Sequence, residues 1–112
     1  MLGTAERELL EETGYAAREW HVLADCFTSP GIIDERLRVF LARDLAVVSR
    51  PDYRPLHEEA HLLTAWVPLE RAVSLVLDGA LHNGVAAIGI LAAYASQRSG
   101  FAALREAAAR EE

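Results

Sequence analysis

The nine residues from Arg7 to Tyr15, RELLEETGY, constrain the fold of this 112-residue chain more than any other stretch. Their first part is rich in good helix formers, and Gly14 suits the left-handed conformation in which many helices end. Thr4 belongs to the residue types that cap helix N-termini. The pattern therefore predicts a helix over residues 4–13 that ends at a glycine.

Three carboxylates of this stretch have the spacing of a single helical face. Glu8 lies three residues before Glu11 and four before Glu12, so the three side chains share one side of the helix. Like charges at this spacing repel mildly unless a cation lies between them. Mg²⁺ is typically bound by one or two carboxylates together with substrate phosphates, which makes a metal site one interpretation. A solvated acidic face is the other.

The order of residues from Arg7 to Tyr15 resembles the C-terminal half of the Nudix box, R-E-U-x-E-E-x-G-U, in which U is an apolar residue. The complete box reads G-x5-E-x7-R-E-U-x-E-E-x-G-U, and only six residues precede Arg7 in this sequence. We therefore expect a chain that begins inside the box and lacks the N-terminal strands of the Nudix fold.

The resemblance implies an α+β fold, a Nudix-like mixed sheet packed between helices. It also implies a Mg²⁺-dependent pyrophosphatase, with Mn²⁺ as a possible substitute, that hydrolyses a nucleoside diphosphate linked to another moiety. In that mechanism Glu8 and Glu12 hold the metal and Glu11 orients a ligand or bridges to the metal through water. Arg7 fixes the carboxylate cluster and does not touch the substrate.

A second motif, Ser29-Pro30-Gly31, interrupts the strand pattern sixteen residues after Gly14. A proline at this distance resembles the ADP-ribose pyrophosphatase branch of the family. The resemblance implies that this loop binds the terminal ribose of ADP-ribose or a related ADP-sugar. The alternative is an ordinary hairpin turn, since proline and glycine are typical turn residues.

A third motif, His57-Glu58-Glu59, lies in a proline-containing loop. In the same branch a flexible loop at this place carries a glutamate that acts as the catalytic base. Glu59 fits this role better than Glu58, judged by the distance to the strand expected after it, but both remain open. A solvated loop carboxylate is the alternative.

Hydrophobic periodicity predicts the remaining elements of a single partial Nudix domain over residues 1–112. Alternation of apolar and polar residues indicates strands, the first two of which form a hairpin with a wide loop. Recurrence at three and four residues indicates helices, and the charged, alanine-rich end is expected to be a tail. The strands cover residues 20–28, 37–42 and 62–68, the helices 69–77 and 84–97, and the tail 98–112.

Composition and charge limit the classes of partner and indicate the cellular compartment. The formal net charge is −6 and every one of the eleven cationic residues is arginine, with no basic patch, which argues against nucleic acid and acidic membranes as partners. The longest apolar run, residues 85–95, is too short to cross a bilayer. A single cysteine, Cys26, excludes an internal disulfide and suits a cytoplasmic protein.

The run at residues 85–95 is apolar on nearly every side, and the first two expected strands carry apolar residues on both faces. We expect a homodimer that buries these surfaces, because large exposed apolar patches mark interaction sites. The competing interpretation of function follows from the missing part of the box. It is a non-catalytic, truncated remnant of the fold, or an interaction module.

Overall fold

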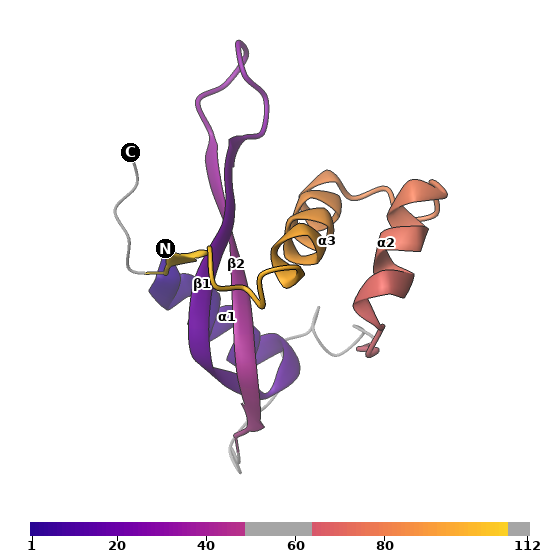
Figure 1. The fold of residues 1–112 in the computed structure, drawn as a ribbon. Coiled ribbons are helices and arrows are strands. Elements are labelled where there is room, and N and C mark those ends of the chain that lie inside the picture. The colour runs from indigo at the N-terminus through magenta and orange to yellow at the C-terminus, as the bar shows by residue number, and fades with distance from the viewer. Residues whose placement is uncertain (49–63, 108–112) are drawn as a thin grey trace. The chain divides into compact units, whose positions relative to one another are not determined.

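The computed structural model describes residues 1–48 and 64–107 of the chain. Within these residues it contains three helices and a three-stranded antiparallel sheet with the strand order β2-β1-β3 (Figure 1). The α+β class is confirmed. The chain divides into two compact units, Met1–Glu19 with Ala42–Trp66 and Trp20–Leu41 with Val67–Glu112. The hairpin strands run through both.

Helix α1, Leu2–Thr13, begins two residues earlier than expected. Thr4 is not its N-cap, because the carbonyl of Met1 already accepts a hydrogen bond from the amide of Ala5 at 3.1 Å and Thr4 lies inside the helix. The end is as predicted. Gly14 adopts a left-handed conformation with φ 77° and ψ 11°.

The hairpin is formed by β1, Tyr15–Phe27, and β2, Arg36–Val47, and it is longer than the alternating segments. The extra length includes charged residues that form cross-strand ion pairs. Arg18 lies 4.0 Å from Asp44, and Arg43 lies 3.7 Å from Glu19. Both strands therefore continue beyond the segments in which apolar and polar residues alternate clearly.

The strand expected at 62–68 is wrong for residues 64–68, which form neither helix nor strand, while 62–63 lie outside the described residues. The third strand is instead β3, Arg105–Glu106, within the expected tail. It pairs antiparallel with β1, with His21 opposite Glu106 and Val22 opposite Arg105. Which segment pairs with the open edge of β1 depends on the tertiary arrangement of the chain. The local sequence of a segment does not show it.

Helix α2 covers Leu69–Leu77 and helix α3 covers Gly84–Gln97, the ranges expected from periodicity. The Asn83 side chain caps α3 by accepting a hydrogen bond from the amide of Ala86 at 3.0 Å. Helix α3 packs on α2 and approaches β2 closely, since a Cβ atom at Gly89 would lie 3.1 Å from Cγ1 of Val39. None of the described helices has the length and apolar character needed to cross a membrane.

The core of the described residues is small. Its buried apolar members are Val22, Ala93 and Ala107, all in the second unit. Helix α1, in the first unit, contributes no buried residue. The acidic helix is therefore a surface element whose polar face meets solvent.

Candidate functional site

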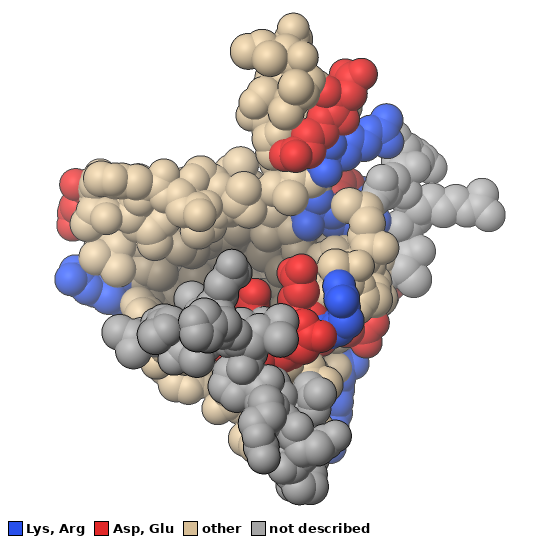
Figure 2. All heavy atoms as spheres, turned by 180° about the vertical axis from the view of Figure 1, so that it is seen from behind, with Lys and Arg blue, Asp and Glu red and all other residues tan. Residues whose placement is uncertain are grey.

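The four expected residues of the acidic cluster lie together on α1. Glu8 and Glu12 are exposed, Glu11 is half-buried, and Arg7 is exposed. One turn of helix separates Glu8 from Glu12, so their carboxylates project from the same face. Carboxylate side chains are accessible at the molecular surface, as the view from behind shows (Figure 2). The helical arrangement of the box residues is confirmed.

The chain closes the C-terminal end of α1 with local hydrogen bonds. The Thr13 hydroxyl donates to the carbonyl of Leu9 at 2.6 Å and accepts from the amide of Tyr15 at 3.2 Å. The amide of Gly14 donates to the carbonyl of Leu10 at 2.9 Å. Glycine is required at this position, because φ of 77° is strained for residues with a Cβ atom.

The donor set of α1 suits a metal ion that brings further ligands with it. Among the described residues no group of three or more His, Cys, Asp or Glu side chains converges as a metal site. Mg²⁺ needs fewer protein ligands, because it retains waters and binds substrate phosphates as well as one or two carboxylates. The exposed carboxylates of Glu8 and Glu12 fit this mode of binding.

The Ser29-Pro30-Gly31 segment forms the turn of the hairpin in the second unit. The carbonyl of Ser29 accepts hydrogen bonds from the amides of Ile32 at 3.1 Å and Ile33 at 3.0 Å. Proline at the second corner and Gly31 with φ 85° at the third are typical of a type II turn. Turn geometry alone thus explains both residue types, and the exposed Pro30 and Gly31 are also accessible to a ligand.

The expected base, Glu59, and its alternative Glu58 lie outside the described residues. The structure thus brings together the four residues on α1, whereas the hairpin turn belongs to the other unit. The roles assigned to these residues stay predictions.

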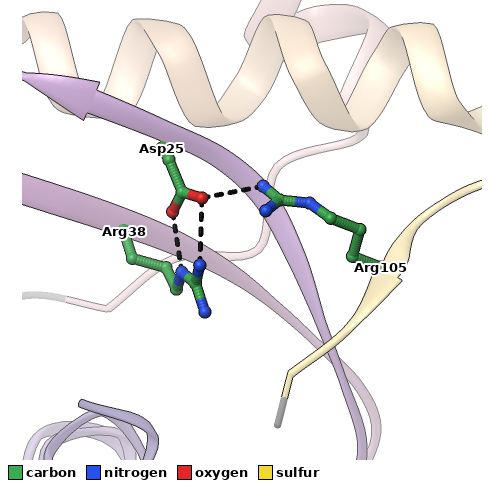
Figure 3. A network of polar contacts seen from close by, with 3 residues as sticks. All are labelled: Asp25, Arg38 and Arg105. Carbon is green, nitrogen blue, oxygen red and sulfur yellow. Dashed lines mark hydrogen bonds and ion pairs between the residues drawn. The ribbon is translucent and has the colours of Figure 1, made fainter. Parts of the chain in front are cut away.

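A polar cluster in the second unit was not anticipated. Asp25 on β1 accepts two hydrogen bonds from Arg38 on β2, Nε to Oδ1 at 2.7 Å and Nη2 to Oδ2 at 3.0 Å. It also accepts one from Nη2 of Arg105 on β3 at 2.9 Å (Figure 3). The Arg38 side chain is only 4 % exposed, so this cluster joins all three strands around a buried cation.

The Asp25–Arg38 pair of this cluster can be expected from the sequence. Thr28 and Glu35 pair across the hairpin, with a backbone hydrogen bond of 3.2 Å and a side-chain one of 2.8 Å. Asp25 lies three residues before Thr28 and Arg38 lies three residues after Glu35, so the two are opposite each other in this register. A hairpin predicted with this register therefore implies the Asp25–Arg38 pair. Arg105 has no such signal because β3 was not expected.

The two arginines affect the pKa of the Asp25 carboxyl. Hydrogen bonds from Arg38 hold the pKa of its carboxyl below the ordinary value of 3.8, and Arg105 acts in the same direction. Partial burial opposes them but is outweighed. Asp25 is therefore ionised in the folded protein at neutral pH.

Comparison with known proteins gives one family match and several relatives. The model of the NUDIX domain family matches residues 1–86. An ADP-ribose pyrophosphatase of Mycobacterium tuberculosis is 46 % identical over 92 residues, 82 % of this chain and 44 % of the relative. An ADP-ribose pyrophosphatase of Bacillus subtilis is 39 % identical over 87 residues, 78 % of this chain and 46 % of the relative.

A third relative is the CMP-5'-(N-acetyl-N-hydroxy-3-aminopropyl)phosphonate hydrolase of Streptomyces rubellomurinus, 34 % identical over 89 residues, 80 % of this chain and 41 % of the relative. The chain thus spans less than half the length of these three relatives. The family match covers most of the chain and includes the acidic helix. By its sequence and its α+β fold, this chain belongs to the NUDIX domain family.

Proposed function

We propose that this protein is a metal-dependent pyrophosphatase that hydrolyses ADP-ribose or a related ADP-sugar into AMP and a sugar phosphate. The observation that carries the proposal is the acidic helix α1, on which Glu8 and Glu12 are exposed on one face. Two relatives named ADP-ribose pyrophosphatase support the substrate class.

The chemistry has two obstacles, the negative charge on the diphosphate oxygens and the weak nucleophilicity of water. A divalent ion, with Mg²⁺ as the proposed species and Mn²⁺ as its substitute, supplies charge neutralisation and a more acidic water when bound. Glu8 and Glu12 would hold it. Glu11, which is half-buried, would orient a ligand or bridge to the metal through water.

The remaining residues complete the proposed reaction. Glu59 takes a proton from the attacking water, which adds to one phosphorus while the bridging oxygen leaves with the other phosphate. Arg7 keeps the carboxylate cluster ordered. The turn at Ser29, Pro30 and Gly31 contacts the terminal ribose. A dimer in the cytoplasm is the proposed working state.

Product analysis tests the proposal. With ADP-ribose and Mg²⁺ we expect AMP and ribose 5-phosphate, at a higher rate than hydrolysis of nucleoside triphosphates. Glu59→Gln should lower kcat much more than it raises KM, since a general base acts mainly in the transition state. The matched control is Glu6→Gln, which changes another exposed carboxylate of α1 and should leave turnover unchanged.

Two other results would redirect the assignment. Faster hydrolysis of nucleoside triphosphates would remove the ADP-sugar substrate while retaining pyrophosphatase chemistry. Absence of any metal-dependent hydrolysis would favour the alternative function, a non-catalytic member of the family that serves as an interaction module.

A further inference from the structure

The acidic helix has no buried side chain to hold it in place. Helix α1 has twelve residues and none of them is buried; Leu9 and Leu10 are only half-buried. Isolated helices of this length are marginal in water, and most helices in proteins are stabilised by packing of an apolar face. A helix with so little burial requires other contacts to hold its carboxylates in one place.

Two such contacts meet directly after α1, within the first unit. The carbonyl of Gly14 accepts a hydrogen bond of 2.9 Å from the amide of Val48, the residue that follows β2. The ring of Tyr15 lies edge-to-face with the indole of Trp66, with centroids 5.6 Å apart and planes at 83°. Gly14 and Tyr15, which are adjacent in the sequence, thus contact two segments that are distant along the chain.

The indole of Trp66 is 72 % exposed, so burial in a core does not explain an aromatic residue there. Its ring contacts that of Tyr15. Edge-to-face aromatic pairs are favourable beyond the area that they bury, because the positive edge of one ring meets the negative face of the other. Tyr15 stands at the last apolar position of the box, immediately after the glycine turn.

We infer that Tyr15 and Trp66 are positioning residues, whose ring contact acts with the Val48–Gly14 hydrogen bond to fix the C-terminal turn of α1. Glu12 lies in this turn and Glu8 one turn earlier, so a rigid helix passes the constraint on to both carboxylates. The expected effect on catalysis rests on the proposed function, whereas the expected effect on the position of α1 does not.

Amide hydrogen exchange tests the structural part in the chain without metal or substrate. Tyr15→Leu and Trp66→Ala should each speed exchange in the last turn of α1 roughly three- to tenfold, the range expected for loss of one aromatic pair. Tyr15→Phe retains the ring and should exchange like the parent. If Trp66→Ala fails to fold, Tyr15→Leu carries the test, because leucine keeps an apolar side chain at position 15.

A second aromatic pair supplies the matched control. Trp20 and Phe40 lie in the other unit with nearly the same geometry, centroids 6.1 Å apart and planes at 82°. Phe40→Leu should reduce stability to a similar degree but leave exchange in α1 unchanged. Unaltered exchange in α1 for both Tyr15→Leu and Trp66→Ala would overturn the inference.

Kinetics with ADP-ribose and Mg²⁺ test the catalytic part. Tyr15→Leu should lower kcat about tenfold with KM changed less than about twofold, because displaced metal ligands affect the transition state most. Tyr15→Phe should restore the rate and Phe40→Leu should retain it. Faster exchange with unchanged kcat would overturn the positioning role. A parent that does not hydrolyse ADP-ribose would overturn the proposed function, and the exchange result would still decide the contact.

Discussion

Asp25 makes the second unit sensitive to acid. Because its pKa is lower in the folded chain than in the unfolded one, the unfolded state binds the proton more readily. The carboxylate therefore contributes stability above its ordinary pKa of 3.8, and this contribution is lost as pH falls through the lower folded value. We expect the midpoint of thermal unfolding to fall steeply below about pH 4, the range of unperturbed Asp groups.

Replacing this carboxylate isolates its effect. Asp25→Asn removes the charged acceptor of Arg38, whose side chain is only 4 % exposed. We expect the free energy of unfolding at pH 7 to fall by about 1–3 kcal/mol, the range of hydrogen bonds that involve a charged group. The acid-dependent loss below pH 4 should become smaller, as measured by urea unfolding at several pH values.

Asp44→Asn is the matched control for Asp25→Asn. Asp44 pairs with Arg18 at 4.0 Å on the surface, and both side chains are more than half exposed. Asn tolerates the positive φ of 58° at this position as well as Asp does. Its unfolding free energy should change by less than about 1 kcal/mol. Equal losses for the two variants would show that the Asp25 cluster has no special role.

The proposed metal site can be tested at single residues of α1. Glu8→Gln and Glu12→Gln should each abolish the Mg²⁺- or Mn²⁺-dependent heat in titration calorimetry, because each removes one of only two charged ligands from a site that is otherwise filled by water. Glu6→Gln should bind as the parent does. Binding by both site variants with parental affinity would place the metal elsewhere.

At the scale of elements, the end of α1 depends on one glycine. Gly14→Ala should lower the free energy of unfolding by about 1–2 kcal/mol, the cost of the left-handed conformation for a residue with a Cβ atom. The space around Gly14 is open, with no atom within 4 Å of an added Cβ, so steric overlap does not contribute. Urea unfolding measures the difference.

Gly3→Ala, in the same helix, is expected to raise the free energy of unfolding. Gly3 has a helical conformation and equally open surroundings, so alanine should stabilise α1 by about 0.5–1 kcal/mol. If both alanine variants shift stability in the same direction, Gly14 does not hold a left-handed turn in solution.

Local patterns predicted elements well where one face is half-buried. The helical period at 69–77 and the Asn83 cap followed by an apolar run correspond to α2 and α3. The strand expected from the apolar run at 62–68 is wrong for residues 64 to 68, which form neither helix nor strand. A short apolar run has strand propensity whether or not an edge is available to it.

At the scale of the whole molecule, the apolar surface of α3 is the main feature without a described partner. Val85, Ile88, Leu91 and Tyr94 are 39 % to 44 % exposed, and they recur every three residues. Only three apolar residues of the described chain are buried. We predict a homodimer at micromolar concentration, measured by sedimentation velocity, because association would bury such a surface.

Charge substitution on α3 tests which surface associates. Leu91→Glu should shift the chain to monomer, whereas Leu77→Glu, at an equally apolar and 73 % exposed position on α2, should not. A monomeric parent that unfolds cooperatively would contradict the dimer and show that the small core is sufficient.

Short sequence patterns were enough to predict the acidic helix, its glycine end, the hairpin and the family resemblance, because each pattern depends on residues that are close to one another in the chain. Tertiary structure decided the rest. The pairing of β3 with β1 and the hydrogen bond between Arg105 and Asp25 join residues at least 80 positions apart. The Tyr15–Trp66 contact links the end of α1 to a segment with no helix or strand. Such contacts are selected by which surfaces meet in the folded chain, and local propensity does not encode that choice.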